Sequence, residues 1–174
     1  MPVVFGEPVN SIDDTLRAFQ RHGDAVRSTY RARYVFDRTS PNPYGRATLE
    51  RPPSLAGNPA EVVYPWEQIF VAAADCAGSD YPMIATHLGV SLDRVELVIE
   101  GVFDPRGEFD GLEGFHAPPD SANCYLSLHL RTTIASSAPR DVLETIQRRV
   151  VSMNMVLGAL RGIPRTTSLE IVPA

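Results

Sequence analysis

The chain has 174 residues, of which 44% are hydrophobic and 21% charged. This size and apolar content are typical of one globular domain with a core, and they exclude a disordered chain, a fibrous repeat and a disulfide-stapled mini-protein. The formal net charge of -5 argues against a broad surface for nucleic acid, because phosphate binding needs a surplus of basic residues on one face.

The two cysteines, Cys76 and Cys124, are too few for a disulfide framework. The first residues lack the basic segment and apolar stretch of a secretory signal. The most apolar windows, such as residues 69–74, are much shorter than the ~20 residues that cross a bilayer. We therefore expect a cytoplasmic protein with reduced thiols and no membrane segment.

The first third of the chain predicts a helix followed by a hairpin. Apolar residues at Ile12, Leu16 and Phe19 follow a helical period after an N-cap at Asn10 or Ser11, and we expect the helix to end near Gly23. Alternation over residues 26–36 and a second short run indicate two strands joined by a turn rich in Pro, Asn and Ser. We expect the turn at 39–45, the second strand at 46–50 and a loop at 51–64.

The next stretch predicts a long buried helix. Pro65 suits a first helical turn, Gly89 suits the stop, and residues 69–77 are nearly all apolar or small. Pro82 lies inside this helix and removes a backbone donor. We therefore expect a kink or a break one turn earlier, around residues 78–79.

The second half predicts two strands, a second long helix and a last strand. The helix begins near Pro139, keeps an apolar repeat through Leu157 and ends near Gly158 or Gly162. Alternation marks the strands. We expect the three strands at 94–103, 123–134 and 166–172, with a loop at 104–120 between the first two.

This ordered set of elements and motifs resembles the OsmC/Ohr family of thiol-dependent hydroperoxide reductases. Pro65-x-Glu67 precedes an Ala-rich helix with Cys76 eleven positions after the proline, and Leu-Gly-Val-Ser-Leu-Asp-Arg-Val-Glu-Leu leads into the next strand. The Ala-Pro-Arg-Asp-Val-Leu start of the second helix and the Arg-Gly-Ile-Pro step into the last strand also match. The likeness covers residues 26–172.

The resemblance implies an α+β, OsmC-like fold in which two central helices pack with antiparallel sheets in an intertwined homodimer. Residues 26–174 would form this domain, and residues 1–25 would be an N-terminal helical extension. The family chemistry needs a helix cysteine that attacks a hydroperoxide as thiolate, a Glu and an Arg that activate it, and a second cysteine that resolves the oxidised sulfur.

Cys76 matches the position of the attacking cysteine, and its alternative is a small buried hydrophobe. The second cysteine is missing, and the matching position is Val150 or Asn154, depending on where a gap is placed. Cys124 could replace it only if its Cα lies within ~7 Å of the Cα of Cys76. The resemblance therefore predicts a cycle with one cysteine in the chain and an external thiol reductant.

Three further residues are candidates for activating the sulfur. Glu67 follows the proline by two positions, where the Ohr pattern has Glu directly after it and this chain has Trp66. At about 100° per residue, Glu67 would lie roughly on the far side of the helix from Cys76, so its alternative role is a first-turn residue favoured by the helix dipole. Arg38 and Arg46 flank the hairpin turn, and either could reach a thiolate across a dimer interface.

Carboxylates near Cys76 act in the opposite direction. Asp75 is its neighbour and Asp80 lies one helical turn further on, and a negative charge beside a sulfur disfavours the thiolate. The four scattered histidines predict no metal site, and the absence of a Gly-rich phosphate loop predicts no cofactor.

Two functions remain open from the sequence. The first is a thiol peroxidase that reduces an organic hydroperoxide through Cys76. The second is a redox-inactive homodimer of the same fold that binds a small apolar ligand.

Overall fold

The computed structural model describes residues 3–4, 7–42, 45–50, 64–122 and 124–174. Its centre is a five-stranded sheet in the order β4-β3-β5-β6-β7, in which only the β6–β7 pair is parallel. The strand bounds are β3 Ser28–Asp37, β4 Arg46–Glu50, β5 Arg94–Phe103, β6 Tyr125–Ala135 and β7 Arg165–Val172. A two-stranded ladder, β1 (Val3–Val4) with β2 (Glu7–Pro8), lies near the N-terminus.

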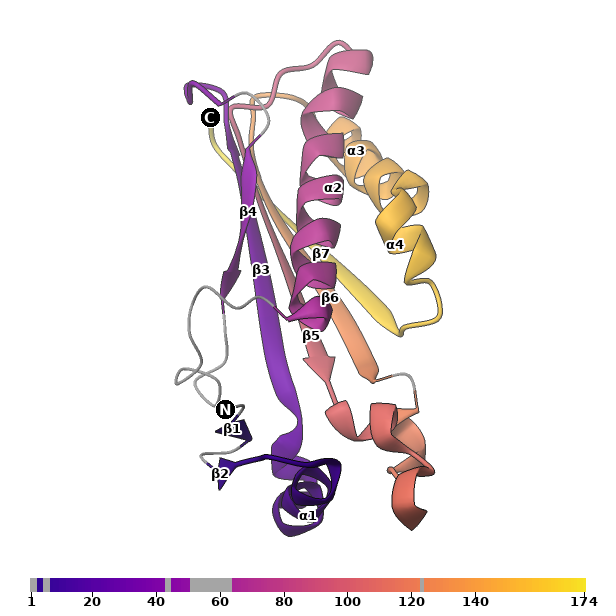
Figure 1. Ribbon diagram of the computed structural model, residues 1–174. Coiled ribbons are helices and arrows are strands. Elements are labelled where there is room, and N and C mark those ends of the chain that lie inside the picture. Colours follow the sequence, from indigo (N-terminus) through magenta and orange to yellow (C-terminus); the bar gives the residue numbers. More distant parts are fainter. Residues whose placement is uncertain (1–2, 5–6, 43–44, 51–63, 123) are drawn as a thin grey trace.

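Three helices cover one face of this sheet (Figure 1). They are α2 (Pro65–His87), α3 (Arg140–Met153) and α4 (Met155–Ala159). Side chains of successive strand residues point to opposite faces. The core therefore forms between the helices and alternate residues of β3, β5 and β6, among them Tyr34, Leu97 and Leu130. On the other face, Arg31 and Arg33 of β3 form cross-strand ion pairs with acids of β5.

Small residues let α2 approach the sheet closely. Ala73, Ala74, Ala77 and Gly78 of this helix are buried against it. A Cβ atom added at Gly78 would lie 2.2 Å from the ring of Tyr34, closer than any van der Waals contact allows. The Ala-rich run therefore places the middle of α2, which includes Cys76, directly on the sheet.

Helix α2 is continuous from Pro65 to His87, so of the kink or break expected near residues 78–79, the break is wrong. Pro82 removes only one backbone donor. Tyr81 and Ile84 on either side of it are buried in the core, and the Thr86 hydroxyl donates to the Pro82 carbonyl at 2.8 Å. Packing of α2 therefore outweighs the missing hydrogen bond.

The second long helix is interrupted where the sequence predicts continuity. Asn154 has extended backbone angles, φ -62° and ψ 125°, and separates α3 from α4. Its side-chain Oδ1 accepts from the backbone N–H of Leu157 at 2.9 Å, which makes it the N-cap of α4. The apolar repeat runs through both helices, but the capping preference of Asn breaks the helix here.

A second packing centre lies at the lower end of the sheet in Figure 1. There α1 (Ile12–His22) and the 3-10 turn η1 (Gly23–Val26) pack on the segment that joins β5 to β6. This joining segment contains the 3-10 turns η3 (Pro105–Phe109), η4 (Leu112–Gly114) and η5 (Pro119–Ser121). Leu16, Phe19, Val26 and Phe115 form its buried cluster.

Candidate functional site

Cys76 lies in the middle of α2, facing the junction between α3 and α4, and it is partly exposed. Its Sγ accepts a hydrogen bond from Nδ2 of Asn154 at 3.1 Å. The Asn154 side chain is nearly buried, with 3% of the residue exposed. The polar neighbour of the sulfur is therefore an amide held within the protein.

The orientation of the Asn154 amide follows from its three contacts. The backbone N–H of Leu157 can only donate, so the atom that receives it is Oδ1 and not the nitrogen. The NH₂ group must then face α2, where it donates to Cys76 Sγ and, at 2.7 Å, to Oδ2 of Asp80. The helix junction thus holds a donor pointed at the sulfur.

The two acids beside Cys76 have different partners. Asp75 Oδ1 accepts from the backbone N–H of Ala47 in β4 at 2.6 Å, which ties α2 to the edge strand. Asp80 shares the Asn154 amide with the sulfur. The Asp80 carboxylate and the Cys76 sulfur therefore share one donor, and the carboxylate lies close to the thiol.

Glu67 lies at the start of α2, nine residues before Cys76, which is about 13 Å along the helix axis. It is fully buried and its Oε2 accepts from the backbone N–H of Tyr64 at 2.9 Å, as part of a capping box. Within one chain, the structure does not bring Glu67 to the sulfur. Its catalytic role stays a prediction.

The two candidate arginines also lie away from Cys76 within one chain. Arg38 forms an ion pair with Asp93 at 2.7 Å. Arg46 is exposed in β4 beside Ala47, which is buried on the α2 side, so the alternation of the strand turns Arg46 to the opposite face. Their part in activating the thiol stays a prediction that needs a second copy of the chain.

Sequence reasoning singled out Asn154 only as a gap-dependent match for the missing thiol. It did not identify the amide as a donor to Cys76, and it missed Arg165, whose Nη1 donates to the Leu157 carbonyl at 3.1 Å in the turn that Asn154 caps. An Asn followed by a short apolar run before Gly158 is the N-cap signal that was available in the sequence.

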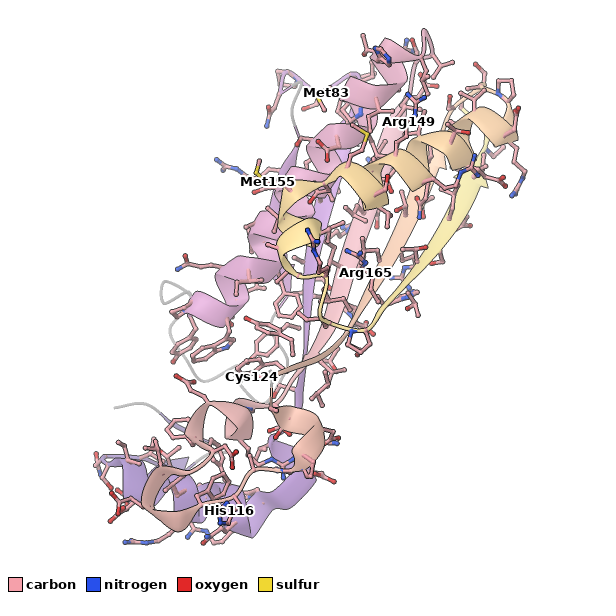
Figure 2. All side chains as sticks on the ribbon, turned by 90° about the vertical axis from the view of Figure 1, so that its right-hand side faces the viewer. Met83, His116, Cys124, Arg149, Met155 and Arg165 are labelled. Atoms are coloured by element: carbon pink, nitrogen blue, oxygen red, sulfur yellow. The ribbon has the colours of Figure 1, made fainter. Side chains whose placement is uncertain are left out.

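Cys124 occupies a different environment at the start of β6, at the lower end of the sheet (Figure 2). It lines a hollow together with Trp66 and Ile69 of α2. Ile69 precedes Cys76 by seven residues, so the hollow lies about 10 Å along α2 from the Cys76 site. Both thiols are free, and this placement does not bring Cys124 to Cys76 as a resolving partner.

Burial raises the pKa of the Cys124 thiol, and the negative charges of Glu108 and Asp104 raise it further. A raised thiol pKa keeps the sulfur protonated and therefore weakly nucleophilic. Cys124 thus has the features of a structural cysteine.

Two features are absent from the part of the chain that the structure describes. No group of three or more His, Cys, Asp or Glu side chains is arranged to hold a metal ion there. None of the helices in that part combines the length and apolar character that spanning a bilayer requires.

No family model matches the sequence, and no curated protein does. Solved structures do match. An OsmC-like hydroperoxide resistance protein from Jannaschia sp. CCS1 is similar, with a TM-score of 0.51 and 11% sequence identity over 78% of this chain and 87% of that chain. A hypothetical protein from Aquifex aeolicus VF5 is similar over 80% of this chain and 96% of that one, with a TM-score of 0.51 and 11% identity. At this identity the likeness concerns the fold, and it confirms the expected fold class: the chain has an α+β, OsmC-like fold.

Proposed function

We propose that the protein is a thiol-dependent peroxidase that reduces organic hydroperoxides through Cys76 alone. The observation that carries the proposal is Cys76, a partly exposed residue whose Sγ receives an N–H from the fixed amide of Asn154 at 3.1 Å. A hydrogen bond donated to the charged form of a group favours that form. The attacking species of such a peroxidase is the thiolate, and the amide is placed to donate to it.

The reaction is a two-electron transfer from sulfur to oxygen. The Cys76 thiolate attacks one peroxide oxygen, the O–O bond breaks, and the alkoxide leaves and takes a proton to become an alcohol. The sulfur is now a sulfenic acid. An external thiol attacks this sulfur, releasing water and forming a mixed disulfide, and a second external thiol regenerates Cys76.

Asn154 is one of the two positions that match the missing thiol in the resemblance; it contacts Cys76 and has no redox chemistry. Its N–H can donate to the sulfenate oxygen as it does to the thiolate. The reductant must then come from solution, since Cys124 lies at the other end of α2.

A homodimer would supply the cation near Cys76 that the candidate arginines of a single chain do not provide. Met83, Met153 and Met155 expose 61%, 68% and 80% of their surface, and they belong to the three helices that cover one face of the sheet. Exposed apolar groups of this kind are typical of an interface. A second copy on this face would cover them, and Arg38 of that copy is then the cation to reach Cys76, because Arg46 points to the opposite face of its sheet. Size-exclusion chromatography at micromolar concentration should then give about twice the 19.1 kDa chain mass, and a monomer would contradict the dimer.

The second candidate function is the redox-inactive dimer that binds a small apolar ligand. The contact that favours it is the hydrogen bond between Asp80 and the same amide that reaches the sulfur, because the carboxylate disfavours the thiolate. The arginine candidates do not offset that charge within one chain.

A peroxidase assay separates the two candidates. Purified protein with excess dithiothreitol should consume cumene hydroperoxide, Cys76→Ser should abolish consumption, and the matched Cys124→Ser should retain it. Dimedone should label Cys76 after one equivalent of peroxide. Equal turnover by the wild type and Cys76→Ser, or none by either, would exclude the peroxidase.

A further inference from the structure

The hollow beside Cys124 is separate from the Cys76 site, since Cys76 is not among its lining residues. We call it the Trp66 groove. Its walls are Trp66 and Ile69 from α2, Phe103 and Tyr125 from the facing ends of β5 and β6, and Glu108 and Cys124 from the joining segment. Its volume is about 450 Å³, which lies within the range of small-molecule sites.

The aromatic side of the groove offers carbon surface. The rings of Tyr64, Trp66 and Phe103 stack in sequence, at 4.6 Å and 5.6 Å between centroids. The polar atoms of two walls already have partners: Trp66 Nε1 donates to the Tyr30 hydroxyl, and the Tyr125 hydroxyl donates to the Trp66 carbonyl, each at 3.2 Å. The rings are therefore locked in place, and a ligand would meet them through its apolar body.

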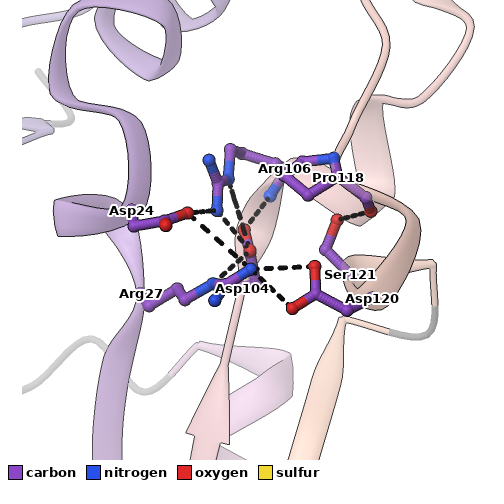
Figure 3. A network of polar contacts seen from close by, with 7 residues as sticks. All are labelled: Asp24, Arg27, Asp104, Arg106, Pro118, Asp120 and Ser121. Carbon is purple, nitrogen blue, oxygen red and sulfur yellow. Dashed lines mark hydrogen bonds and ion pairs between the residues drawn. The ribbon is translucent and has the colours of Figure 1, made fainter.

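The opposite wall is held by a buried ion network (Figure 3). Asp104 is fully buried and accepts hydrogen bonds from Arg106 at 2.8 Å and from Arg27 at 3.0 Å. Arg27 also binds Asp120, and Arg106 binds Asp24. These contacts fasten both ends of the joining segment to η1 and β3, so the groove exists before any ligand arrives.

The backbone at Cys124 has an unusual conformation that neighbouring residues hold in place. Cys124 has φ +60°, in the left-handed region that a side chain rarely adopts. Its backbone N–H donates to Ser121 and its carbonyl accepts from Asp104, at 2.8 Å and 2.7 Å. Gly107 fits beside it only because it has no Cβ, since such an atom would lie 1.9 Å from the Ser121 carbonyl oxygen. These contacts therefore fix the place at which Cys124 enters the wall of the groove.

The charge at the groove is negative. Glu108 is exposed, and in the part of the chain that the structure describes it has no ion-pair partner. The nearby cations, Arg27 and Arg106, are both engaged by Asp24, Asp104 and Asp120, so this end of the molecule has an excess of negative charge. Cys124, with its raised pKa, adds a neutral thiol.

From these features we propose that the Trp66 groove binds a small organic cation, an ammonium head on an apolar body. The body lies on the aromatic and aliphatic wall, and the head lies against the Glu108 carboxylate. An anionic ligand of the same shape would bring a second negative charge to Glu108 and is disfavoured. The site uses other residues than Cys76, so it does not depend on the peroxidase proposal.

Trp66 is the one tryptophan of the chain, so its fluorescence reports directly on this groove. Titration of the full chain with hexyltrimethylammonium should change the emission to saturation. Hexanol should bind more weakly, and hexanoate roughly tenfold more weakly than the ammonium, because one attractive charge contact has become repulsive. Glu108→Gln should weaken the ammonium about fivefold and reduce the difference between the three probes.

Two further variants control this experiment. Glu113→Gln removes an exposed acid from the same joining segment outside the groove and should leave the titration unchanged. Ala122→Leu adds bulk to the lining and should abolish binding of every probe. Equal affinity for all three probes, no saturation, or emission that changes with protein concentration alone because a second copy covers the groove, would each overturn the proposal.

Discussion

The two cysteines of this chain lie in opposite chemical settings. Cys76 receives an N–H from a side chain whose orientation is fixed by a helix cap. Cys124 lies in a strained turn where burial and two acids raise its thiol pKa. The comparison shows that two partly buried thiols of one chain have different polar surroundings: an amide donor faces Cys76, whereas two carboxylates act on Cys124.

The largest expected effect is a loss of unfolding free energy when the buried ion network around Asp104 is broken. Asp104→Ala leaves Arg106, with 7% of its side chain exposed, without its main partner. Removing one member of a buried pair costs about 3–5 kcal/mol of unfolding free energy, which guanidinium denaturation will measure. Glu100→Ala is the matched control, because its pair with Arg31 is largely exposed and costs ~1 kcal/mol or less. A similar loss in both variants would contradict the structural role of the network.

The same network predicts how stability depends on acid. Burial alone raises the pKa of the Asp104 carboxyl, but the hydrogen bonds from Arg106 and Arg27 together outweigh it, and the pKa lies below its ordinary value of 3.8. The stabilising contribution of Asp104 is therefore complete above pH 3.8 and is lost as the pH falls through the lower, folded-state pKa. Acid titrations of unfolding free energy should show a smaller loss in Asp104→Ala than in the wild type over this window.

The second prediction compares the alkylation rates of the two thiols. At pH 7.5, iodoacetamide should alkylate Cys76 in the Cys124→Ser variant about tenfold faster than it alkylates Cys124 in Cys76→Ser, because only the thiolate reacts. The rate at Cys124 should rise steeply only at and above its ordinary pKa of 9.0. Mass spectrometry of timed samples gives both rates, and equal rates at pH 7.5 would remove the contrast between the two sites.

The third effect separates the two roles of Asn154. Asn154→Ser keeps an oxygen that can cap α4 but removes the N–H directed at the sulfur, whereas Asn154→Ala removes both. We expect the Ala variant to be less stable than the Ser variant by about 1 kcal/mol, the usual value of an N-cap. Both should alkylate at Cys76 more slowly than the wild type. An unchanged rate in both would show that the amide does not support the thiolate.

The smallest effect concerns the two acids beside Cys76. Asp80→Asn keeps an oxygen for the Asn154 amide and removes a negative charge close to the sulfur, so alkylation should become roughly two- to fivefold faster. Asp75→Asn is the control, since its oxygen can still accept from Ala47 and its charge is directed toward β4. A slower reaction in Asp80→Asn, or an equal acceleration in both variants, would contradict this arrangement.

Patterns in the sequence predicted the five strands of the sheet, the long helix over residues 65–87 and a second helix that begins near Pro139. They did not predict the break at Asn154, because the apolar repeat through Val150 and Leu157 continues across it while the capping preference is local. The pairing of β6 with β7 in parallel also depends on where α3 and α4 pack, which no local pattern encodes. Cys76 was identified from its motif, whereas its contact with Asn154 depends on how α2 meets the α3–α4 junction.

The Asn154 junction also limits how this site can change. A thiol at position 154 would restore a partner for Cys76 through one codon, but it would remove the oxygen that starts α4 and the donor that satisfies Asp80. A cysteine at position 154 would therefore need compensating substitutions in the surrounding scaffold. One side chain serves both the start of a helix and the surroundings of a sulfur, so position 154 cannot change for one role alone.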